Sequence, residues 1–508
     1  MDKGSPSIIE IVPAHNGLTN LTYFSHRHYE VGQVVPVDLR GGKIPGLIVR
    51  ISSVSKFKGS LKKHRFELKK INSVPTGLKL QAKLVEALQS MADYHMQSMA
   101  SVLNLVLPRL SNIRVIMDHA KIVICVPNIS LAKSLSGNGD EFITTVKNLV
   151  LLSGRIREIV VSDRPGAYRT PRDPGIDLKK YIEHFSHSVN ARYTERMLIN
   201  SVNETTHRSE PTRLIQIKGK TILSSELISF VQRAIKDQVS ILLIVSRKGY
   251  SALTICSDCG ELLLCKHCTA PLVLHVTKER KYKCHHCNYE EKITIHCRRC
   301  DNWKLIPMGM GLERVREELA RIIPDSKTAN IRITTLNDAL NIASPIAYSA
   351  VVSIDSLFSI PDFSIREKIF YDLTTLRKMT TESMLVQTRH PNEPLFKFLT
   401  SGDGDGFRKS DLEIRRALNY PPFAMFIKVT HRGTVVEKRG FMAFAKNALK
   451  DYNPIITDAF IPMVARKYIT HAIVKLLPDG WPDEKLRQIL ENMMSPKINV
   501  TIDPDNLL

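Results

Sequence analysis

Eight of the chain's nine cysteines lie between Cys256 and Cys300 and form four C-x-x-C pairs. The pairs are Cys256/Cys259, Cys265/Cys268, Cys284/Cys287 and Cys297/Cys300. A C-x-x-C turn places two thiolates on one side of a tight knuckle, and two such knuckles complete a tetrahedral zinc site. Four knuckles therefore predict two zinc ions. Because eight cysteine ligands leave no open position for bound water, we expect both sites to be structural rather than catalytic.

Disulfide bonds are the alternative use of these cysteines. Disulfides persist in oxidising compartments, and residues 1–12 lack the basic region and apolar core of an export signal. Only Cys125 lies outside the cluster. We therefore expect zinc and a cytoplasmic protein. The spacing alone does not tell whether successive pairs share a zinc or whether the pairs are nested. The nearby histidines are interpreted as exposed side chains and not as additional ligands: His267, His275, His285, His286 and His296.

The charge of the chain is strongly positive. Its 508 residues include 72 Lys and Arg against 50 Asp and Glu, a net charge of +22, and this length predicts several domains. Nucleic-acid phosphates are the commonest partner of such a surface, and anionic membranes come second. No apolar run approaches the roughly 20 residues of a membrane span. A basic run near the N-terminus favours phosphate contact: Lys56, Lys58, Lys62, Lys63, Arg65, Lys69 and Lys70.

The order of the predicted elements divides the chain into parts. Residues 20–75 are β-rich, residues 80–107 have helical periodicity, and residues 121–126 and 158–161 are short apolar strands of an α/β lobe. A buried strand at 240–245 directly precedes the cysteine pairs, and a helix at 312–322 and a strand at 350–354 follow them. The cysteine-rich segment is therefore predicted to be an insert in a second α/β lobe. Residues 401–406, which alternate Gly with Asp, are interpreted as a flexible linker before a compact α+β domain.

Several stretches resemble the primosomal protein N-prime (PriA) family of replication-restart helicases. The gaps of five, fifteen and nine residues between the cysteine pairs are similar to that family's. Other matching stretches occur along the chain, less closely over residues 100–215: Leu21-Thr22-Tyr23, Val34–Gly46, Arg247-Lys248-Gly249-Tyr250-Ser251, Gly309-Met310-Gly311-Leu312-Glu313, Ile354-Asp355, Ile360-Pro361-Asp362-Phe363, Glu413-Ile414-Arg415-Arg416, Tyr420-Pro421-Pro422-Phe423 and Val500-Thr501-Ile502-Asp503-Pro504.

The resemblance implies a multidomain α/β fold. It places an N-terminal β domain that binds the 3′ end of DNA at residues 1–75, a degenerate RecA-like helicase lobe at 76–215, and a second degenerate lobe at 216–255 and 304–400. The two-zinc insert spans 256–303, and the α+β domain spans 401–508. It also implies nested zinc sites. Cys256, Cys259, Cys297 and Cys300 would hold one ion, and Cys265, Cys268, Cys284 and Cys287 the other.

The parts of a helicase that hold ATP are missing from the sequence. A phosphate-binding loop needs glycines and a lysine, yet no glycine lies between Gly77 and Gly137, where that loop belongs. The string Gly219-Lys220-Thr221 comes too late in the chain and lacks the loop's first glycine. Ser162-Asp163-Arg164-Pro165 replaces the acidic Mg²⁺ motif, and residues 372–383 replace the arginine-rich motif. ATP and Mg²⁺ are therefore not expected, and we interpret the chain as a motorless relative rather than an enzyme.

DNA contact is expected at Tyr23, which would stack on a base or belong to the core, and at Arg40, Lys62 and Lys63, which would contact phosphates. Thr22 stands where the family has an acidic residue, so the resemblance does not support contact with the 3′-hydroxyl. The leading hypothesis is a bacterial, nucleoid-associated protein of replication restart that binds forked or single-stranded DNA together with primosome proteins and single-stranded DNA-binding protein. The alternatives are a 3′-to-5′ helicase with diverged motifs and a zinc scaffold that binds RNA or protein.

Overall fold

The computed structural model of the protein describes these residues: 6–39, 42–54, 68–113, 116–117, 122–126, 141–153, 156–162, 168, 176–196, 212–217, 222–246, 253–256, 258–259, 263–266, 272–276, 280–284, 289–292, 296–297, 299–302, 305–308, 311–324, 330–340, 342, 346–358, 360, 362–464 and 466–507. The chain divides into two compact units, residues 1–198 and 199–508. Each unit is described by itself.

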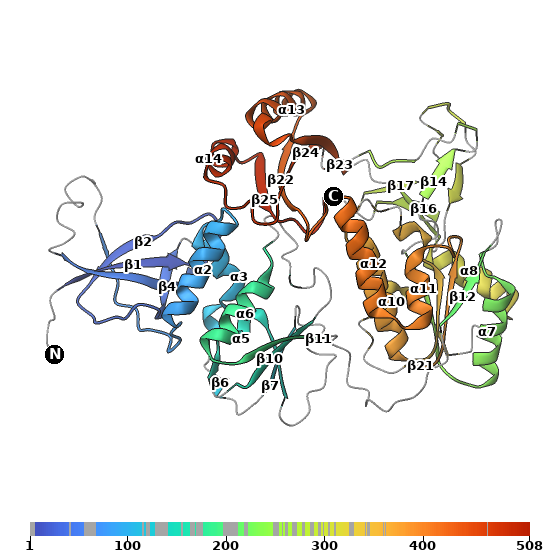
Figure 1. Ribbon diagram of the computed structural model, residues 1–508, viewed down its shortest axis with the longest axis horizontal. Coiled ribbons are helices and arrows are strands. Elements are labelled where there is room, and N and C mark those ends of the chain that lie inside the picture. The colour runs from blue at the N-terminus through green and yellow to red at the C-terminus, as the bar shows by residue number, and fades with distance from the viewer. Residues whose placement is uncertain are drawn as a thin grey trace. The chain divides into compact units, whose positions relative to one another are not determined.

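The first unit begins with a five-stranded sheet in the order β3-β4-β1-β2-β5 (Figure 1). β1 pairs antiparallel with β2 and β4, and the short β5 runs parallel to β2. Alternate residues of a strand face the same side, so Ile9, Val35 and Val37 are buried together in one small core. The strands are β1 (Ser7–Pro13), β2 (Leu21–Ser25), β3 (Val34–Leu39), β4 (Gly42–Ser53) and β5 (Lys69–Lys70).

Two helices, α2 (Ala82–Tyr94) and α3 (Met99–Val106), occupy the segment predicted to be helical. The helical conformation is interrupted between them because Met96 has a positive φ of 53°. The Ser98 side chain then caps the start of α3. His95 is buried beside this interruption. One hydrophobic core runs from the N-terminal sheet through both helices and into a second sheet.

The second sheet of this unit has four parallel strands in the order β11-β10-β7-β8. Its strands are β7 (Ile122–Val126), β8 (Glu141–Thr145), β10 (Glu158–Ser162) and β11 (Arg192–Arg196). Helix α6 (Leu178–Ser188), capped by Asp177, packs Tyr181 and Phe185 into the shared core. The remaining elements are short: η1 (Leu110–Asn112), β6 (Ile116–Met117), α5 (Val146–Leu149) and β9 (Leu152–Ser153).

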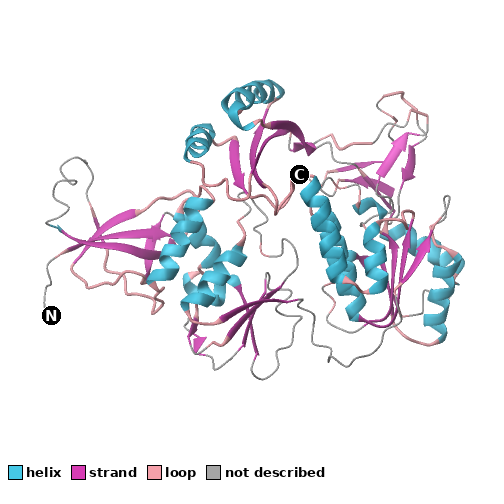
Figure 2. Cartoon of the chain, viewed as in Figure 1, coloured by secondary structure: helices cyan, strands magenta, loops and turns pink. Residues whose placement is uncertain are grey.

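The second unit contains a five-stranded parallel sheet in the order β12-β21-β20-β13-β19. All five residues of β13 are buried, which is typical of a strand covered on both faces. Helices α7 (Ser225–Lys236) and α8 (Leu312–Ile322) cover one face (Figure 2). The strands are β12 (Arg213–Gln216), β13 (Ile241–Val245), β19 (Ile331–Thr335), β20 (Ile346–Ser353) and β21 (Thr380–Thr388).

The other face of this sheet is covered by later helices that share one core. They are α9 (Leu336–Ala339), α10 (Ile365–Met379), α11 (Pro394–Ser401) and α12 (Gly404–Ala417), and η3 (Asp355–Leu357) precedes α10. The core side chains include Phe370 of α10 and Phe407 of α12, whose rings stack at 3.9 Å.

The prediction of a flexible linker at residues 401–406 was wrong. Gly402 ends α11 in a left-handed conformation, with φ of 73°. The Asp403 side chain then accepts a hydrogen bond from the Gly406 N–H and caps α12. The Gly and Asp residues that suggested flexibility therefore form a tight turn between two helices, and α12 packs on α10 and α11.

The cysteine-rich insert follows β13 and precedes α8. At its base β14 (Leu253–Cys256) pairs antiparallel with β18 (Leu305–Met308). Its middle contains an antiparallel three-stranded sheet of β15 (Val273–Val276), β16 (Arg280–Lys283) and β17 (Glu290–Lys292).

A βαββαβ domain forms the end of the chain. Its antiparallel sheet has the order β23-β24-β22-β25, the arrangement of ferredoxin-like folds. Thr434 and Glu437 form a capping box at the start of α13. The elements are β22 (Met425–Gly433), α13 (Val435–Ala448), η4 (Lys450–Tyr452), β23 (Ile455–Val464), β24 (Lys467–Leu476), α14 (Glu484–Met493) and β25 (Ile498–Ile502).

Candidate functional site

Four cysteines from the two ends of the insert come together. The sulfur atoms of Cys256, Cys259, Cys297 and Cys300 all lie within 4.8 Å of one another. The Sγ atoms of Cys256 and Cys300 are 3.5 Å apart, as are those of Cys259 and Cys297. The antiparallel pairing of β14 with β18 produces this arrangement, because Cys256 ends β14 and faces Leu305 at the start of β18.

The donor set of this cluster fits a zinc ion. Tetrahedral zinc with Zn–S bonds of about 2.3 Å separates its sulfurs by about 3.8 Å, close to the observed distances. All four cysteines are free of disulfides. Backbone N–H groups of Cys300 and Arg299 lower the pKa of the Cys297 thiol, whereas the neighbouring cysteine sulfurs raise the pKa of the Cys300 thiol. Asp301, just after the second knuckle, has a left-handed φ of 58°.

The structure describes one cysteine of each inner pair. Cys265 and Cys284 are both buried in the small core of the insert, with Leu263, Leu272 and Tyr282. Cys284 follows β16, and its N–H donates to the carbonyl of Tyr289. Cys268 and Cys287 lie outside the described residues, so a second four-sulfur cluster stays a prediction.

Tyr23 lies on β2 of the N-terminal sheet, and Lys69 of β5 pairs directly beside it. The Tyr23 ring is half-buried against the core that contains Ile9 and Val37. Its pKa is raised first by that burial and second by the charge of Asp38. One side of the ring thus belongs to the core, while an exposed lysine stands next to it.

Three of the four predicted DNA contacts lie outside the described residues: Arg40, Lys62 and Lys63. Lys69 and Lys70 belong to the basic run that favours phosphate contact, although they were not among the residues predicted individually to contact DNA. Both are exposed, and their place beside Tyr23 and Phe24 depends on a parallel strand pairing that periodicity in a two-residue strand cannot indicate.

The carboxyl ends of β7 and β10, where ligands of parallel sheets usually bind, are joined by a tyrosine. The Tyr168 hydroxyl accepts a hydrogen bond from the Ser162 N–H at 2.9 Å and donates one to the carbonyl of Cys125. The ring is buried in the core, and this burial raises the pKa of the hydroxyl. Asp163 and the string Gly219-Lys220-Thr221 lie outside the described residues.

Helix α10 replaces the segment where an arginine-rich motif was expected. Arg377 near its end donates to the Thr212 hydroxyl at 3.1 Å and to the carbonyl of Leu399 at 3.2 Å. This guanidinium therefore joins α10 to the start of β12 and the end of α11.

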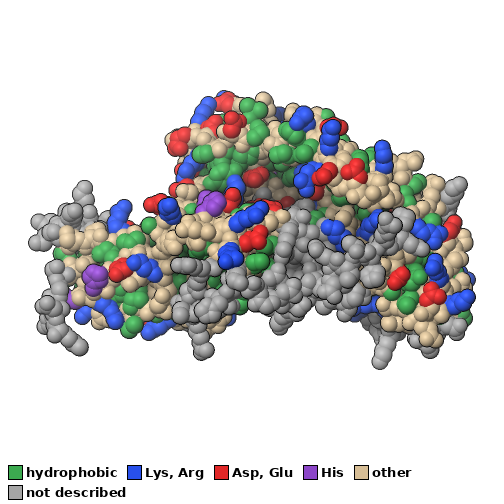
Figure 3. All heavy atoms as spheres, turned by 60° about the horizontal axis from the view of Figure 1, so that its bottom comes forward, with side chains coloured by type: hydrophobic (Ala, Val, Ile, Leu, Met, Phe, Trp, Pro, Cys, Tyr) green, Lys and Arg blue, Asp and Glu red, His purple; other side chains and the backbone are tan. Residues whose placement is uncertain are grey.

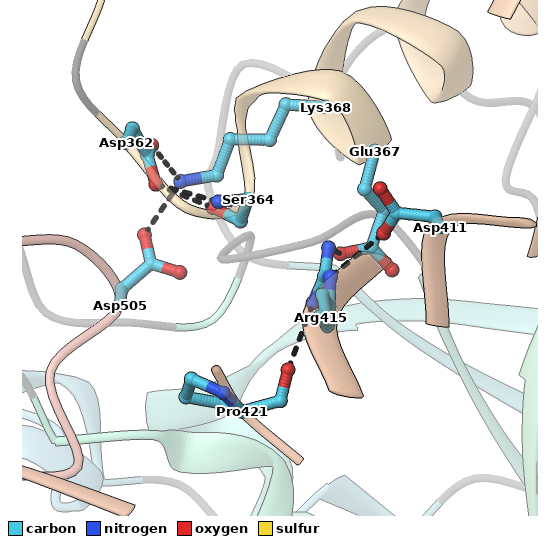
Figure 4. A network of polar contacts seen from close by, with 8 residues as sticks. All are labelled: Asp362, Ser364, Glu367, Lys368, Asp411, Arg415, Pro421 and Asp505. Carbon is cyan, nitrogen blue, oxygen red and sulfur yellow. Dashed lines mark hydrogen bonds and ion pairs between the residues drawn. The ribbon is translucent and has the colours of Figure 1, made fainter. Parts of the chain in front are cut away.

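A polar network joins α10 to α12 and to the end of the chain (Figure 4). Arg415 forms ion pairs with Glu367 and Asp411 and donates to the carbonyl of Pro421. Burial raises the pKa of Asp411, although Arg415 lies beside it. Lys368 pairs with Asp362 at 3.0 Å and with Asp505 at 3.1 Å. Asp362, Arg415 and Pro421, from three of the stretches that carry the family resemblance, therefore belong to this network.

This fold and site define a class: multidomain α/β proteins with an all-cysteine cluster compatible with zinc. Residues 11–108 match the family model of the PriA 3′DNA-binding domain, which extends past residue 75 over α2 and α3. Curated proteins named Replication restart protein PriA are also similar. The one from Borreliella burgdorferi is 27% identical over 253 residues, which cover 44% of this chain and 38% of that protein. The Rickettsia prowazekii protein is 30% identical over 241 residues, covering 41% and 37%.

The chain is therefore similar to the PriA family over residues 11–108 and over the stretches that these curated proteins match. The Bacillus subtilis protein of the same name is 26% identical over 312 residues, or 54% of this chain and 39% of that protein. These matches cover about two fifths of the relatives' length. In the part of the chain that the structure describes, no helix has both the length and the apolar character needed to span a bilayer.

Proposed function

We propose that the chain is a DNA-binding protein of replication restart that recognises forked or single-stranded DNA without hydrolysing ATP. The observation that carries the proposal is the match of residues 11–108 to a 3′DNA-binding domain. The net charge of +22 supports a phosphate-bearing partner. The protein would act at the nucleoid in the bacterial cytoplasm, with primosome proteins and single-stranded DNA-binding protein as its protein partners.

Three features support the absence of a motor. The sequence lacks the glycine-rich loop, the acidic motif and the arginine-rich motif together. The Tyr168 hydroxyl occupies the ends of β7 and β10, so a buried tyrosine stands where a nucleotide would approach the sheet. Arg377, one of the few basic residues near the expected arginine-rich motif, has its guanidinium bonded to Thr212 and Leu399.

Two structural zinc ions complete the proposal. The cluster of Cys256, Cys259, Cys297 and Cys300 supports the outer site of the nested pairing. Cys265, Cys268, Cys284 and Cys287 would hold the inner ion, which the burial of Cys265 and Cys284 in one core supports. Zinc here would fix the fold of the insert, because closed four-sulfur sites leave no position for a reacting water.

Fluorescence anisotropy with labelled fork DNA, single-stranded DNA and blunt duplex tests DNA recognition. We expect tighter binding to fork and single-stranded DNA, a steep salt dependence, and no effect of ATP. Lys69→Gln with Lys70→Gln should weaken binding and reduce the salt slope by about two, because each lysine neutralises about one phosphate. Lys485→Gln, on the exposed face of α14, is the matched control.

Competition separates the alternatives. If structured RNA displaces fork DNA at equal concentration, the result supports the hypothesis of a zinc scaffold that binds RNA and contradicts the DNA proposal. A failure of all three DNA substrates to bind at low salt would also contradict it.

A further inference from the structure

Helix α13 exposes a stripe of apolar side chains. Val436 is 73% exposed, Phe444 48% and Val435 45%. Val436, Gly440, Ala443 and Phe444 are spaced i, i+4, i+7 and i+8, so they lie along one side of the helix. On the opposite side Phe441 and Ala445 are buried against the sheet. Eight of the ten exposed large hydrophobic side chains among the described residues fall between residues 418 and 494, and the surface view shows hydrophobic side chains among charged ones over this domain (Figure 3).

Small residues in the middle of the stripe would allow a second helix to approach α13 closely. A Cβ added at Gly440 would meet no atom within 4 Å, so packing within the domain does not require glycine there. Glycine in a helix costs about 1 kcal/mol relative to alanine. A smooth path over Gly440 and Ala443, bordered by Val436 and Phe444, would let the backbone of a second helix approach closely.

The charges beside the stripe are unbalanced. Arg439 and Lys446 are exposed on one flank, and neither forms an ion pair with any described residue. The other charged side chains of the helix are already paired: Lys438 with Asp458 at 2.6 Å, and Glu437 with Lys497. The flank of the apolar stripe therefore carries two cations without carboxylate partners in the described part of the chain.

These charges decide which occupant fits. In an antiparallel pairing of α13 with a second copy, the flanks that carry Arg439 and Lys446 would face each other, and like charges would oppose association. A nucleic acid would find two cations and the Asn447 amide, but otherwise apolar side chains along the stripe. An amphipathic helix with acidic residues beside its apolar face would pack on the stripe and pair with Arg439 and Lys446. We propose that α13 docks such a helix from a protein partner, a role separate from the proposed DNA binding.

The test uses the full chain and two labelled helical peptides, each with leucines on one face. The first has glutamates beside the leucines and the second has lysines. Anisotropy should show that the glutamate peptide binds at least about tenfold more tightly. Phe444→Asp and Val436→Asp should each weaken its binding about tenfold or more, whereas Leu477→Asp, an equally exposed position off α13, should not. Circular dichroism checks that the variants remain folded.

Charge reversal provides the sharper readout. Arg439→Glu with Lys446→Glu should invert the preference, so that the lysine peptide binds more tightly. The proposal is overturned if neither peptide binds, if both bind equally, or if the double variant leaves the preference unchanged. It is also overturned if sedimentation shows a dimer that Phe444→Asp dissociates, because α13 would then contact a second copy.

Discussion

The guanidinium of Arg415 lies 2.8 Å from the Glu367 carboxylate, and this ion pair joins α12 to α10. Arg415 is 9% exposed and also pairs with Asp411 at 2.7 Å. Since its remaining contact is the carbonyl of Pro421, just before β22, one side chain connects the parallel sheet's helices to the start of the C-terminal domain.

Removing this guanidinium should destabilise the second unit. Arg415→Met leaves Asp411 buried without its cation, and breaking such a pair costs about 3 kcal/mol. Urea unfolding measures the loss. Arg416→Met is the control, because Arg416 is exposed and lies over the Phe423 ring at 4.6 Å, an interaction that contributes about 1 kcal/mol or less at an exposed site. Equal losses for both variants would show that the network does not stabilise the unit.

Zinc content distinguishes nested from sequential pairing. We expect the purified chain to contain two zinc ions, and Cys125→Ser to keep both. Cys256→Ser with Cys300→Ser changes only the outer site in the nested arrangement, so one ion should remain. In a sequential arrangement these residues belong to different sites, and both ions would be lost. Metal analysis by mass spectrometry gives the count directly.

Metal removal should have a local effect. Chelation should unfold the insert, whose small core surrounds Cys265 and Cys284, while β22 to β25 remain folded. Limited proteolysis with and without chelator should therefore produce new cleavage within residues 253–308 only. An unchanged cleavage pattern would contradict a structural role for the metal.

Tyr168→Phe should lower the free energy of unfolding of the first unit. The substitution leaves the buried Cys125 carbonyl and Ser162 N–H without the hydroxyl that bridges them, at a cost of about 2 kcal/mol. Thermal unfolding of Tyr168→Phe is compared with that of Tyr193→Phe, whose hydroxyl donates to exposed Glu195. Similar melting temperatures for the two variants would argue against the bridge.

Acid should destabilise the C-terminal domain through His471. Burial, aided by Lys428 and Arg432, lowers the pKa of His471 to about 4, whereas an unfolded histidine titrates near 6.5. The unfolded state therefore takes up the proton first. Stability is complete above about pH 6.5 and falls by about 3 kcal/mol as the pH drops to about 4. The lowered pKa of His431 adds to the same trend.

Trp481 reports on this domain because it is buried there. Replacing the second tryptophan, Trp303, with Phe isolates the signal. His471→Gln should flatten the dependence of the unfolding free energy on pH, while His184→Gln, at an exposed position, should leave it unchanged. A His471→Gln variant with the full pH dependence would assign the effect to other groups.

The sequence predicted those helices and strands that have a clear hydrophobic pattern within their own residues. The run Ile241–Val245 is continuously apolar, and Leu312–Ile322 has clear helical periodicity, so the strand and helix around the insert were placed closely. The cysteine spacing indicated knuckles but not their pairing, because two thiolate pairs can combine over any loop length.

What the sequence did not predict depends on contacts between distant residues. Gly402 and Asp403 suggested flexibility, yet each has the conformation of a helix end, which is decided by the packing of α11 on α12. Tyr168 gave no local sign of its bridging role, since its partners Cys125 and Ser162 meet only when β7 pairs with β10. The order of the C-terminal strands likewise depends on long-range pairing.

The central claim is that the chain binds DNA without a motor, and ATP hydrolysis by the purified chain tests it most directly. The assay compares fork DNA, single-stranded DNA and no DNA, at concentrations where anisotropy shows that the DNA is bound. We predict hydrolysis at the background rate in all three conditions. Hydrolysis that fork DNA stimulates, and that follows the purified chain through chromatography, would contradict the account.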